Sequence, residues 1–269
     1  MIRSIFHHAD LNFCVARSFD GPDFIFQHGL CGDAAQPADV FPAHIGWSCV
    51  TLECRGHGQS EAGSPEGFSI GTFADDLAAY IEAQGGAPVV IGGISMGAVI
   101  ALRLAVKRPD LVRALVIARP AWRLDAAPHN MQPNALVGEL LRTYPAQEAR
   151  LRFDASATAA MLAEQAPDNL ASLRGFFARQ PLAVTAELLS RISADGPGVS
   201  QSEVRALKIP TLVIGHERDY VHPLELAREL ADMIPVARLA TITPKATDPA
   251  QYKADFGAAL TQFLKELTL

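Results

Sequence analysis

The chain has 269 residues, a net charge of −6 and a sequence pI of about 5.7. Hydrophobic residues make up 49% of it and charged residues 19%, a composition that is typical of a well-buried globular protein and excludes a disordered chain. The acidic balance and the lack of a basic run argue against nucleic acid or an acidic membrane surface as a partner.

The N-terminal residues and the cysteines indicate the compartment. Residues 1–13 contain no sustained apolar stretch and no A-x-A cleavage site, so we expect no signal peptide. No apolar run reaches the length of about 18 residues that a membrane-spanning helix needs. Cys14, Cys31, Cys49 and Cys54 show no C-x-x-C spacing and are expected to be reduced thiols. We therefore expect a cytoplasmic protein without cofactor, metal or membrane partner. The oligomeric state stays open, with a homodimer among the alternatives.

The first 118 residues predict a sheet that begins with a hairpin. Ile2–His8 and Leu11–Ser18 alternate apolar and polar residues and predict its two strands. Further strands are expected at 23–29, Trp47–Glu53, 88–95 and 112–118, and helices at Ile70–Gln84 and 96–109. Because strands that alternate with helices usually pair in parallel, this order predicts a doubly wound, mostly parallel sheet of the α/β class.

The alternation stops after Ala118, and residues 119–205 show no convincing strand. Helices are predicted there instead, at Ala135–Thr143, Ala146–Gln165, Asn169–Arg179 and Val184–Ser193. Strands resume at 209–215 and Ala237–Ile242, and helices at Pro223–Met233 and Pro249–Leu267. We interpret residues 120–204 as a helical cap inserted into a core formed by residues 1–119 and 205–269. A second helical layer without a functional role is the alternative.

The strongest functional signal is the sequence GISMG (residues 93–97), which fits the pattern G-x-S-x-G between a predicted strand and a predicted helix. The serine of this pattern sits on a sharp, strained turn, so the residues two before and two after it must be small. The hydroxyl of Ser95 is then exposed at the end of the strand. The helix N-terminus and the amide of Met96 face any oxyanion that forms there. A glycine-rich turn that only packs closely is the alternative.

Two further motifs favour the catalytic interpretation. His28 and Gly29 follow a strand and open a loop in which the amide of Leu30 can be a second oxyanion donor. The segment ECRGHGQS (Glu53–Ser60) lies between this loop and the serine turn.

The H-G loop, the R-G-H-G-x-S turn and the G-x-S-x-G elbow, in this order, resemble the α/β-hydrolase superfamily over almost the whole chain. The resemblance implies an eight-stranded sheet with an antiparallel start, a helical cap after the sixth strand and a Ser–acid–His triad. By motif position it implies Ser95 as the nucleophile and Leu30 and Met96 as the oxyanion donors. His57 matches a residue that usually supports loops, so we interpret it as structural.

The resemblance also implies the acid of the triad. In the family an aspartate follows the seventh strand by a few residues and precedes a helix that begins with proline. Asp219, between Gly215 and Pro223, matches this position. A surface turn or a helix N-cap is the alternative role for its side chain.

The third member of the triad is missing from its expected place. After the last strand the family pattern is roughly Pro-x-Ala-Gly-His, whereas this chain has PKATD (residues 244–248). The histidine position is occupied by Asp248, or by Thr247 if the loop is shifted by one residue, and no histidine follows His222. Because an unassisted serine is a poor nucleophile at neutral pH, a useful rate requires a substitute base.

Three side chains are candidates for that base. His222, three residues beyond Asp219, is the preferred one, with polar packing or helix capping as its alternative role. Lys245 would be the base of a Ser–Lys pair if burial removed its proton, but we favour it as a cation that binds an anionic substrate. Asp248 could position a water molecule, although a carboxylate is a weak base for a serine.

Basic and aromatic residues at the root of the predicted cap are candidate substrate contacts. Arg119 and Arg123, with Lys245, would make the mouth of the pocket cationic and suit a substrate that carries a carboxylate. Trp122 would line its apolar part. Surface ion pairs for the arginines, and packing of the cap for the tryptophan, are the alternatives.

Three functional hypotheses follow. The first is a cofactor-independent enzyme that hydrolyses a small ester, thioester or lactone through Ser95 and an incomplete or rearranged triad. The second is a catalytically weak or inactive member of the fold that binds a small ligand under its cap. The third is a cofactor-free lyase or isomerase that uses the oxyanion hole and Lys245 without acylating Ser95.

Overall fold

The computed structural model describes residues 1–43 and 45–267. Its strands form one sheet of eight, in the order β1-β2-β4-β3-β5-β6-β7-β8. β1 pairs antiparallel with β2 and β2 with β4, and the other pairs are parallel. The predicted fold class, a mostly parallel doubly wound sheet that starts antiparallel, is confirmed. The strands are β1 (Ile2–His8), β2 (Leu11–Ser18), β3 (Asp23–Gln27), β4 (Ser48–Leu52), β5 (Val89–Ile94), β6 (Val112–Ala118), β7 (Thr211–Gly215) and β8 (Ala237–Thr241).

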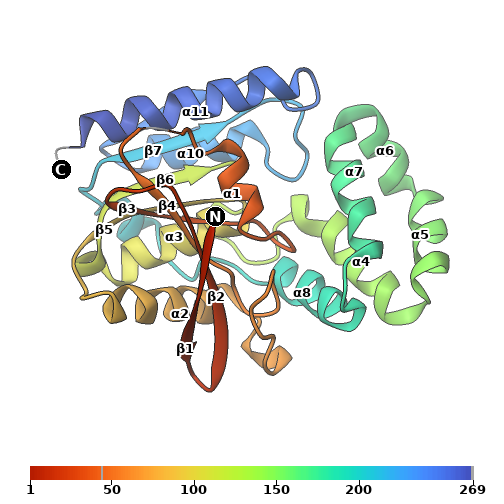
Figure 1. Ribbon diagram of the computed structural model, residues 1–269. Helices are drawn as coiled ribbons and strands as arrows, with labels where there is room; N and C mark the ends of the chain where they lie inside the picture. Colours follow the sequence, from red (N-terminus) through yellow and green to blue (C-terminus); the bar gives the residue numbers. More distant parts are fainter. Residues whose placement is uncertain (44, 268–269) are drawn as a thin grey trace.

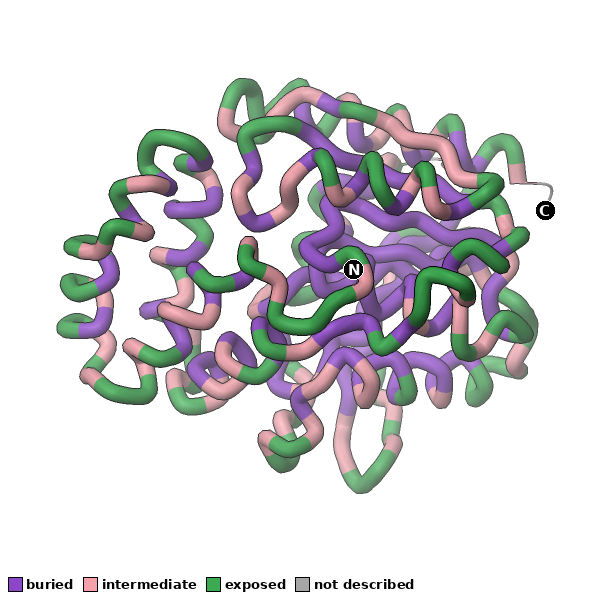
Figure 2. Tube along the Cα trace, turned by 180° about the vertical axis from the view of Figure 1, so that it is seen from behind, coloured by how far each residue is buried: buried purple, intermediate pink, exposed green. Residues whose placement is uncertain are grey.

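Helices cover both faces of the sheet (Figure 1). One hydrophobic cluster joins the sheet to α2 (Ile70–Ala83), α3 (Met96–Lys107) and α10 (Leu224–Met233). A second cluster, on the other face, joins it to α1 (Ala35–Val40) and α11 (Pro249–Glu266). Each fully buried leucine or phenylalanine of these clusters stabilises the fold by about 1.5–3 kcal/mol. Figure 2 shows the buried chain concentrated in the strands between these helices.

A helical insertion separates β6 from β7. Residues 119–210 are all described and contain no strand. Figure 1 shows α4 to α8 grouped beside the sheet, beyond one end of the strands. We use "helical insertion" for α4 (Gln132–Thr143), α5 (Ala146–Asp154), α6 (Ala157–Gln165), α7 (Pro167–Gly175), the short η4 (Phe176–Ala178), α8 (Leu182–Ala194) and α9 (Gln201–Arg205). None of the helices described has the length and the apolar run needed to cross a bilayer.

The predicted helix over Ala146–Gln165 is wrong as a single helix, because the chain forms α5 and α6 there. Ser156 causes the break. Its hydroxyl donates to the carbonyl of Phe153 (2.7 Å) and accepts from the amide of Ala159 (3.1 Å), so it caps a new helix. The short helices α1 and α9 were not predicted, although α9 begins with a capping box, Ser200 with Glu203, that could have been read from the sequence.

Candidate active site

The serine elbow lies between β5 and α3, and its backbone is strained. Ser95 has φ 57° and ψ −112°, a left-handed conformation that is rare outside glycine. A Cβ atom on Gly93 would lie 2.2 Å from the carbonyl carbon of Gly97, and one on Gly97 would lie 2.4 Å from the carbonyl oxygen of Gln27. Close backbone approach therefore requires both glycines of the G-x-S-x-G pattern.

The loop after β3 presents the amide of Leu30. The preceding carbonyl, that of Gly29, accepts hydrogen bonds from the amide of Gly32 (3.0 Å) and from Nδ1 of His28 (2.9 Å). Because the C=O and N–H of a trans peptide point in opposite directions, the Leu30 amide points away from these partners. Met96 is the first residue of α3, and amides of the first helical turn have no acceptor within the helix. The amide of Leu30, in a loop that lines the same pocket as Ser95, and the amide of Met96, at the start of α3, are therefore both free of partners in their own elements.

His57 supports the Leu30 loop from the R-G-H-G turn. Its Nε2 accepts a hydrogen bond from the amide of Cys31 (3.0 Å), and its Nδ1 donates to the carbonyl of Arg55 (2.9 Å). Burial, and then the neighbouring His28 and Arg179, hold the pKa of His57 well below its ordinary value. The ring is therefore a neutral structural link at the place where a loop-supporting role was predicted.

A cavity of about 380 Å³ lies between the carboxyl ends of the strands and the helical insertion. The core contributes residues from the loops after β3, β5, β6, β7 and β8, and the insertion contributes residues of α4, α7 and η4. Among the lining side chains are Leu30, Ser95, Arg119, His222 and Lys245 from the core, and Asn134, Asp168, Asn169, Ser172, Phe176 and Arg179 from the insertion. Within the part of the chain that is described, no three His, Cys, Asp or Glu side chains gather in a way that could hold a metal.

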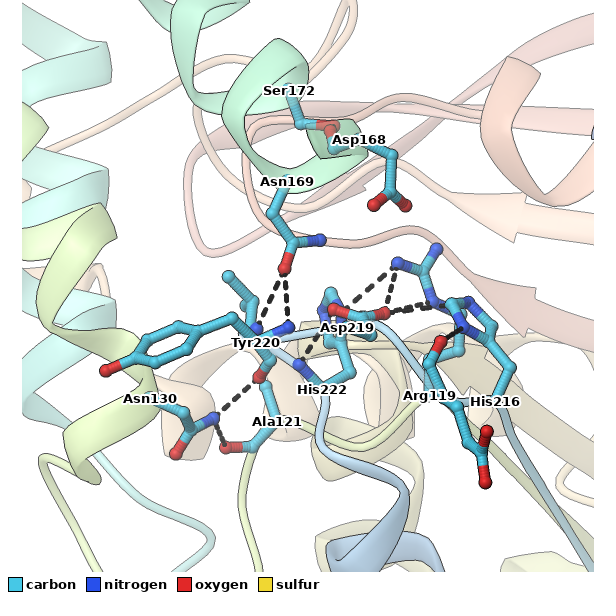
Figure 3. A network of polar contacts seen from close by, with 12 residues as sticks. Arg119, Ala121, Asn130, Asp168, Asn169, Ser172, His216, Asp219, Tyr220 and His222 are labelled. Carbon is cyan, nitrogen blue, oxygen red and sulfur yellow. Dashed lines mark hydrogen bonds and ion pairs between the residues drawn. The ribbon is translucent and has the colours of Figure 1, made fainter. Parts of the chain in front are cut away.

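Asp219 and His222 form a pair on the loop after β7 (Figure 3). Nδ1 of His222 lies 2.9 Å from each carboxylate oxygen, and the His222 amide donates to Oδ1 (3.0 Å). Because a carboxylate only accepts hydrogen bonds, we assign the ring proton to Nδ1. Nε2 of His222 is then unprotonated and can act as a base. Asp219 therefore orients a histidine, although in this chain that histidine belongs to its own turn.

Arg119 is bound to Asp219. Its Nη2 and Nε donate to Oδ2 of Asp219 at 2.6 and 3.0 Å, and Nη2 lies 3.3 Å from Nδ1 of His222. Burial alone would raise the pKa of Asp219, but the charges of Arg119 and then His222 hold it well below its ordinary value. Arg119 does line the pocket. The expectation that Arg119 makes the mouth of the pocket cationic is nevertheless corrected, because the carboxylate of Asp219 compensates the guanidinium charge.

His216 is a neighbour of Asp219 that sequence reasoning missed. Its ring is fully buried directly after β7, and Nε2 lies 3.6 Å from Oδ2 of Asp219. Its Nδ1 donates to the carbonyl of Glu217 (2.7 Å). His216 is three residues before Asp219, just as His222 is three residues after it, and this symmetric spacing was the available signal. Unlike His222, His216 does not line the pocket.

The loop after β8, where a histidine was expected, has a helix-capping role. Oδ1 of Asp248 accepts hydrogen bonds from the amides of Ala250 and Gln251, both at 3.0 Å, and so caps α11. Asp248 and Thr247 are exposed and do not line the pocket. Lys245 from the same loop is exposed and does line it.

Two of the predicted substrate contacts lie outside the pocket lining. Arg123 is exposed and forms ion pairs with Glu229 of α10 (3.1 Å) and with Asp125 (3.3 Å). Trp122 is buried, and its Nε1 donates to the carbonyl of Asp195 (2.9 Å). In place of the expected substrate contacts, Arg123 therefore forms surface ion pairs and Trp122 packs at the root of the insertion.

Buried neutral histidines make the stability of the protein sensitive to acid. Burial is the main cause that lowers the pKa of His28, His57, His216 and His222. The unfolded chain therefore binds more protons below the ordinary histidine pKa of about 6.5, so the free energy of unfolding should fall as the pH drops from 7.5 to 5.5. The upper limit is about 1.4 kcal/mol per pH unit for each histidine. Urea midpoints at the two pH values test this. Replacing the exposed His129 with glutamine should leave the difference between the two midpoints unchanged. Equal midpoints at pH 7.5 and pH 5.5 in the wild-type protein would contradict the prediction.

Comparisons with known proteins identify the family. The family model described as the alpha/beta hydrolase fold matches residues 22–256. BpoC of Mycobacterium tuberculosis, named as a non-heme bromoperoxidase, is 32% identical over 223 residues, which cover 81% of this chain and 83% of BpoC. The chain belongs to the α/β hydrolase fold family.

The relatives differ in the reactions for which they are named. The crystal structure of BpoC matches with a TM-score of 0.70 at 26% identity, covering 98% of this chain and 99% of that one. The enol-lactonase of Burkholderia xenovorans LB400 matches with a TM-score of 0.74 at 20% identity, covering 97% and 100%, and this likeness is one of fold. The sn-1-specific diacylglycerol lipase ABHD11 of Mus musculus is 26% identical over 261 residues, 90% of this chain and 81% of its own.

Proposed function

We propose that this protein hydrolyses a small ester, thioester or lactone, with Ser95 as the nucleophile and with Asp219 and His222 as the acid and base of a rearranged triad. The observation that carries the proposal is the 2.9 Å contact between His222 and Asp219 at a pocket that Ser95 also lines. The relative named as a diacylglycerol lipase supports the ester class. The cavity of about 380 Å³ has the size of a small-molecule site.

The reaction would proceed by acyl transfer. Nε2 of His222 removes the hydroxyl proton as Oγ of Ser95 attacks the acyl carbon, and Asp219 stabilises the imidazolium that forms. The amides of Leu30 and Met96 donate to the oxyanion. The leaving group departs with the proton from His222, and the acyl group remains on Ser95. A water molecule, deprotonated by His222, then attacks the acyl carbon and releases the acid and the free serine.

Arg119 adjusts this triad by its charge. Burial lowers the pKa of His222, Asp219 opposes that effect, and the Arg119 guanidinium lowers the pKa further. The imidazole is therefore neutral, and able to accept a proton, to a lower pH than an ordinary histidine. The cost is a weaker base, because the cation that neutralises Asp219 also disfavours the imidazolium formed in the reaction.

An acidic group on the substrate would bind at Lys245. This side chain is exposed at the pocket, and the described residues provide it with no ion pair. Asp168 of α7 faces Arg119 across the pocket (Figure 3), so the α7 side would repel a carboxylate. Asp219 compensates Arg119. Arg179 also lines the pocket, but its donors are engaged by the carbonyls of Cys31 and Gly56 and by Oγ1 of Thr185. Lys245 is therefore the basis on which we retain a carboxylate-bearing substrate.

A fluorophosphonate probe tests the nucleophile directly, because it phosphonylates a serine, with loss of fluoride, only where a base and an oxyanion hole activate that serine. The wild-type protein should be labelled on Ser95, as located by peptide mass spectrometry, and Ser95→Ala should not be labelled. Ser172→Ala is the matched control, because Ser172 lines the same pocket and bonds only to the carbonyl of Asp168 in its own helix. Wild-type protein that stays unlabelled at high probe concentration would contradict the proposal.

A second candidate function is ligand binding with little catalysis. It is favoured by the number of structural contacts that Asp219 makes, since Arg119, His216 and the His222 amide all surround its carboxylate. Such a carboxylate can serve as a structural centre without orienting a base. The labelling experiment separates the two candidates, since a binding protein leaves Ser95 unreactive.

A further inference from the structure

The residue that follows the proposed oxyanion donor Leu30 is held in a strained conformation. Cys31 has φ 59°, which costs free energy for any residue other than glycine and persists only where the surroundings fix it. Its amide donates to Nε2 of His57 (3.0 Å), and its carbonyl accepts from Nε of Arg179 (3.1 Å). The peptide groups on both sides of Cys31 are thus fixed, one by the core and one by the helical insertion.

Arg179 links three segments of the fold. It follows η4 in the helical insertion, and besides Cys31 its guanidinium reaches the carbonyl of Gly56 through Nη2 (2.6 Å) and Oγ1 of Thr185 in α8 through Nη1 (2.8 Å). Gly56 belongs to the same R-G-H-G turn as His57. All three acceptors are neutral, because two are backbone carbonyls and the third is a hydroxyl. The planar guanidinium therefore acts here through the directions of its donors more than through its charge.

We propose that Arg179 is a positioning residue for the oxyanion hole, which it ties to the helical insertion through the backbone of Cys31. The inference rests on the proposed function, because the hole is defined by the reaction of Ser95. One consequence is that the hole is complete only while the insertion is docked on the core. Covering the substrate and polarising its carbonyl group are then a single event.

The second-order rate constant for fluorophosphonate labelling of Ser95 measures the oxyanion hole without a known substrate. Removing one oxyanion donor typically costs about 10²- to 10³-fold in rate, so displacing one by releasing its loop should slow labelling by about 10- to 100-fold in Arg179→Ala. Arg179→Lys should also be slow, because one ammonium cannot donate to three diverging acceptors. Arg174→Ala is the control: this arginine of α7 pairs with Asp154 (2.8 Å) away from the pocket and should label at the wild-type rate.

Chemical rescue separates positioning from a general structural role. Guanidinium ion added at millimolar concentration to Arg179→Ala should restore labelling several-fold, whereas methylammonium should not. With an ester that is turned over, Arg179→Ala should lower kcat with little change in KM, whereas Lys245→Met should mainly raise KM. Labelling of Arg179→Ala at the wild-type rate would overturn the inference while leaving the proposed function intact. Slow labelling that guanidinium does not rescue, in a variant that has also lost thermal stability, would overturn the inference too, because a general structural role would then explain the slow rate. Unlabelled wild-type protein would overturn the proposed function and this inference with it.

Discussion

Replacing His222 with alanine should lower kcat/KM for a small ester by about 10⁴- to 10⁶-fold, since removal of the base from a serine triad has an effect of this size. The residual rate would come from the oxyanion donors and from substrate binding. The proposal assigns proton transfer to Nε2 of this ring because Nδ1 is bound to Asp219 at 2.9 Å. The measurement is steady-state kinetics on a p-nitrophenyl ester, with the fold checked by circular dichroism.

His216 provides the matched control for this experiment. It contacts the same carboxylate at 3.6 Å but is fully buried and does not line the pocket. His216→Gln should therefore keep activity within about tenfold of the wild type, since it leaves the proposed base and nucleophile in place. If His216→Gln lost as much activity as His222→Ala, or if His222→Ala kept wild-type activity, the assignment of His222 as the base would be wrong.

Replacing Asp219 with alanine should reduce the free energy of unfolding by about 3–5 kcal/mol, the usual cost of leaving a buried charge without its partner. Arg119 is only 8% exposed, and Asp219 accepts two of its donors at 2.6 and 3.0 Å. Without that carboxylate the guanidinium would remain buried beside the ring of Tyr252, to which it lies 5.8 Å from the centroid. Urea denaturation followed by fluorescence measures the loss.

A second substitution shows whether the unpaired charge is the cause. Arg119→Met in the Asp219→Ala background removes the charge and keeps an apolar chain of similar length, so it should recover a large part of the lost stability. The carboxylate contacts to the ring and to the amide of His222 would still be absent from the double variant. A double variant as unstable as Asp219→Ala alone would show that the turn, and not the ion pair, carries the stability.

Local patterns explain why much of the fold and the strained turn at Ser95 could be predicted. Gly93 and Gly97 lie two residues on either side of Ser95, and the steric need for both is a property of one turn. The strands alternate with helices in an order that few topologies satisfy. Sequence alone was less informative about helix ends, as the capping hydroxyl of Ser156 shows.

Long-range partners explain most of the errors at the site. Arg119 and Asp219 are 100 residues apart in the chain, and nothing in either segment indicates that they pair. Arg119 and Arg123 look equivalent in the sequence, yet one faces the pocket and the other pairs with Glu229 of α10. Arg179, which sequence reasoning did not single out, has a neutral set of partners that only the folded chain brings together.

Because Asp219 and His222 lie within one turn, the proposed proton transfer and the entry of substrate depend on different loops, which evolution can change independently. A backbone hydrogen bond from His222 to Asp219 fixes the geometry of the pair, so it needs no help from the loop after β8. That loop, residues 243–248, caps α11 and contributes Lys245 to the mouth of the pocket. On the proposed function, its sequence can drift or lengthen, and so alter which substrates enter, while the machinery for moving protons is inherited unchanged.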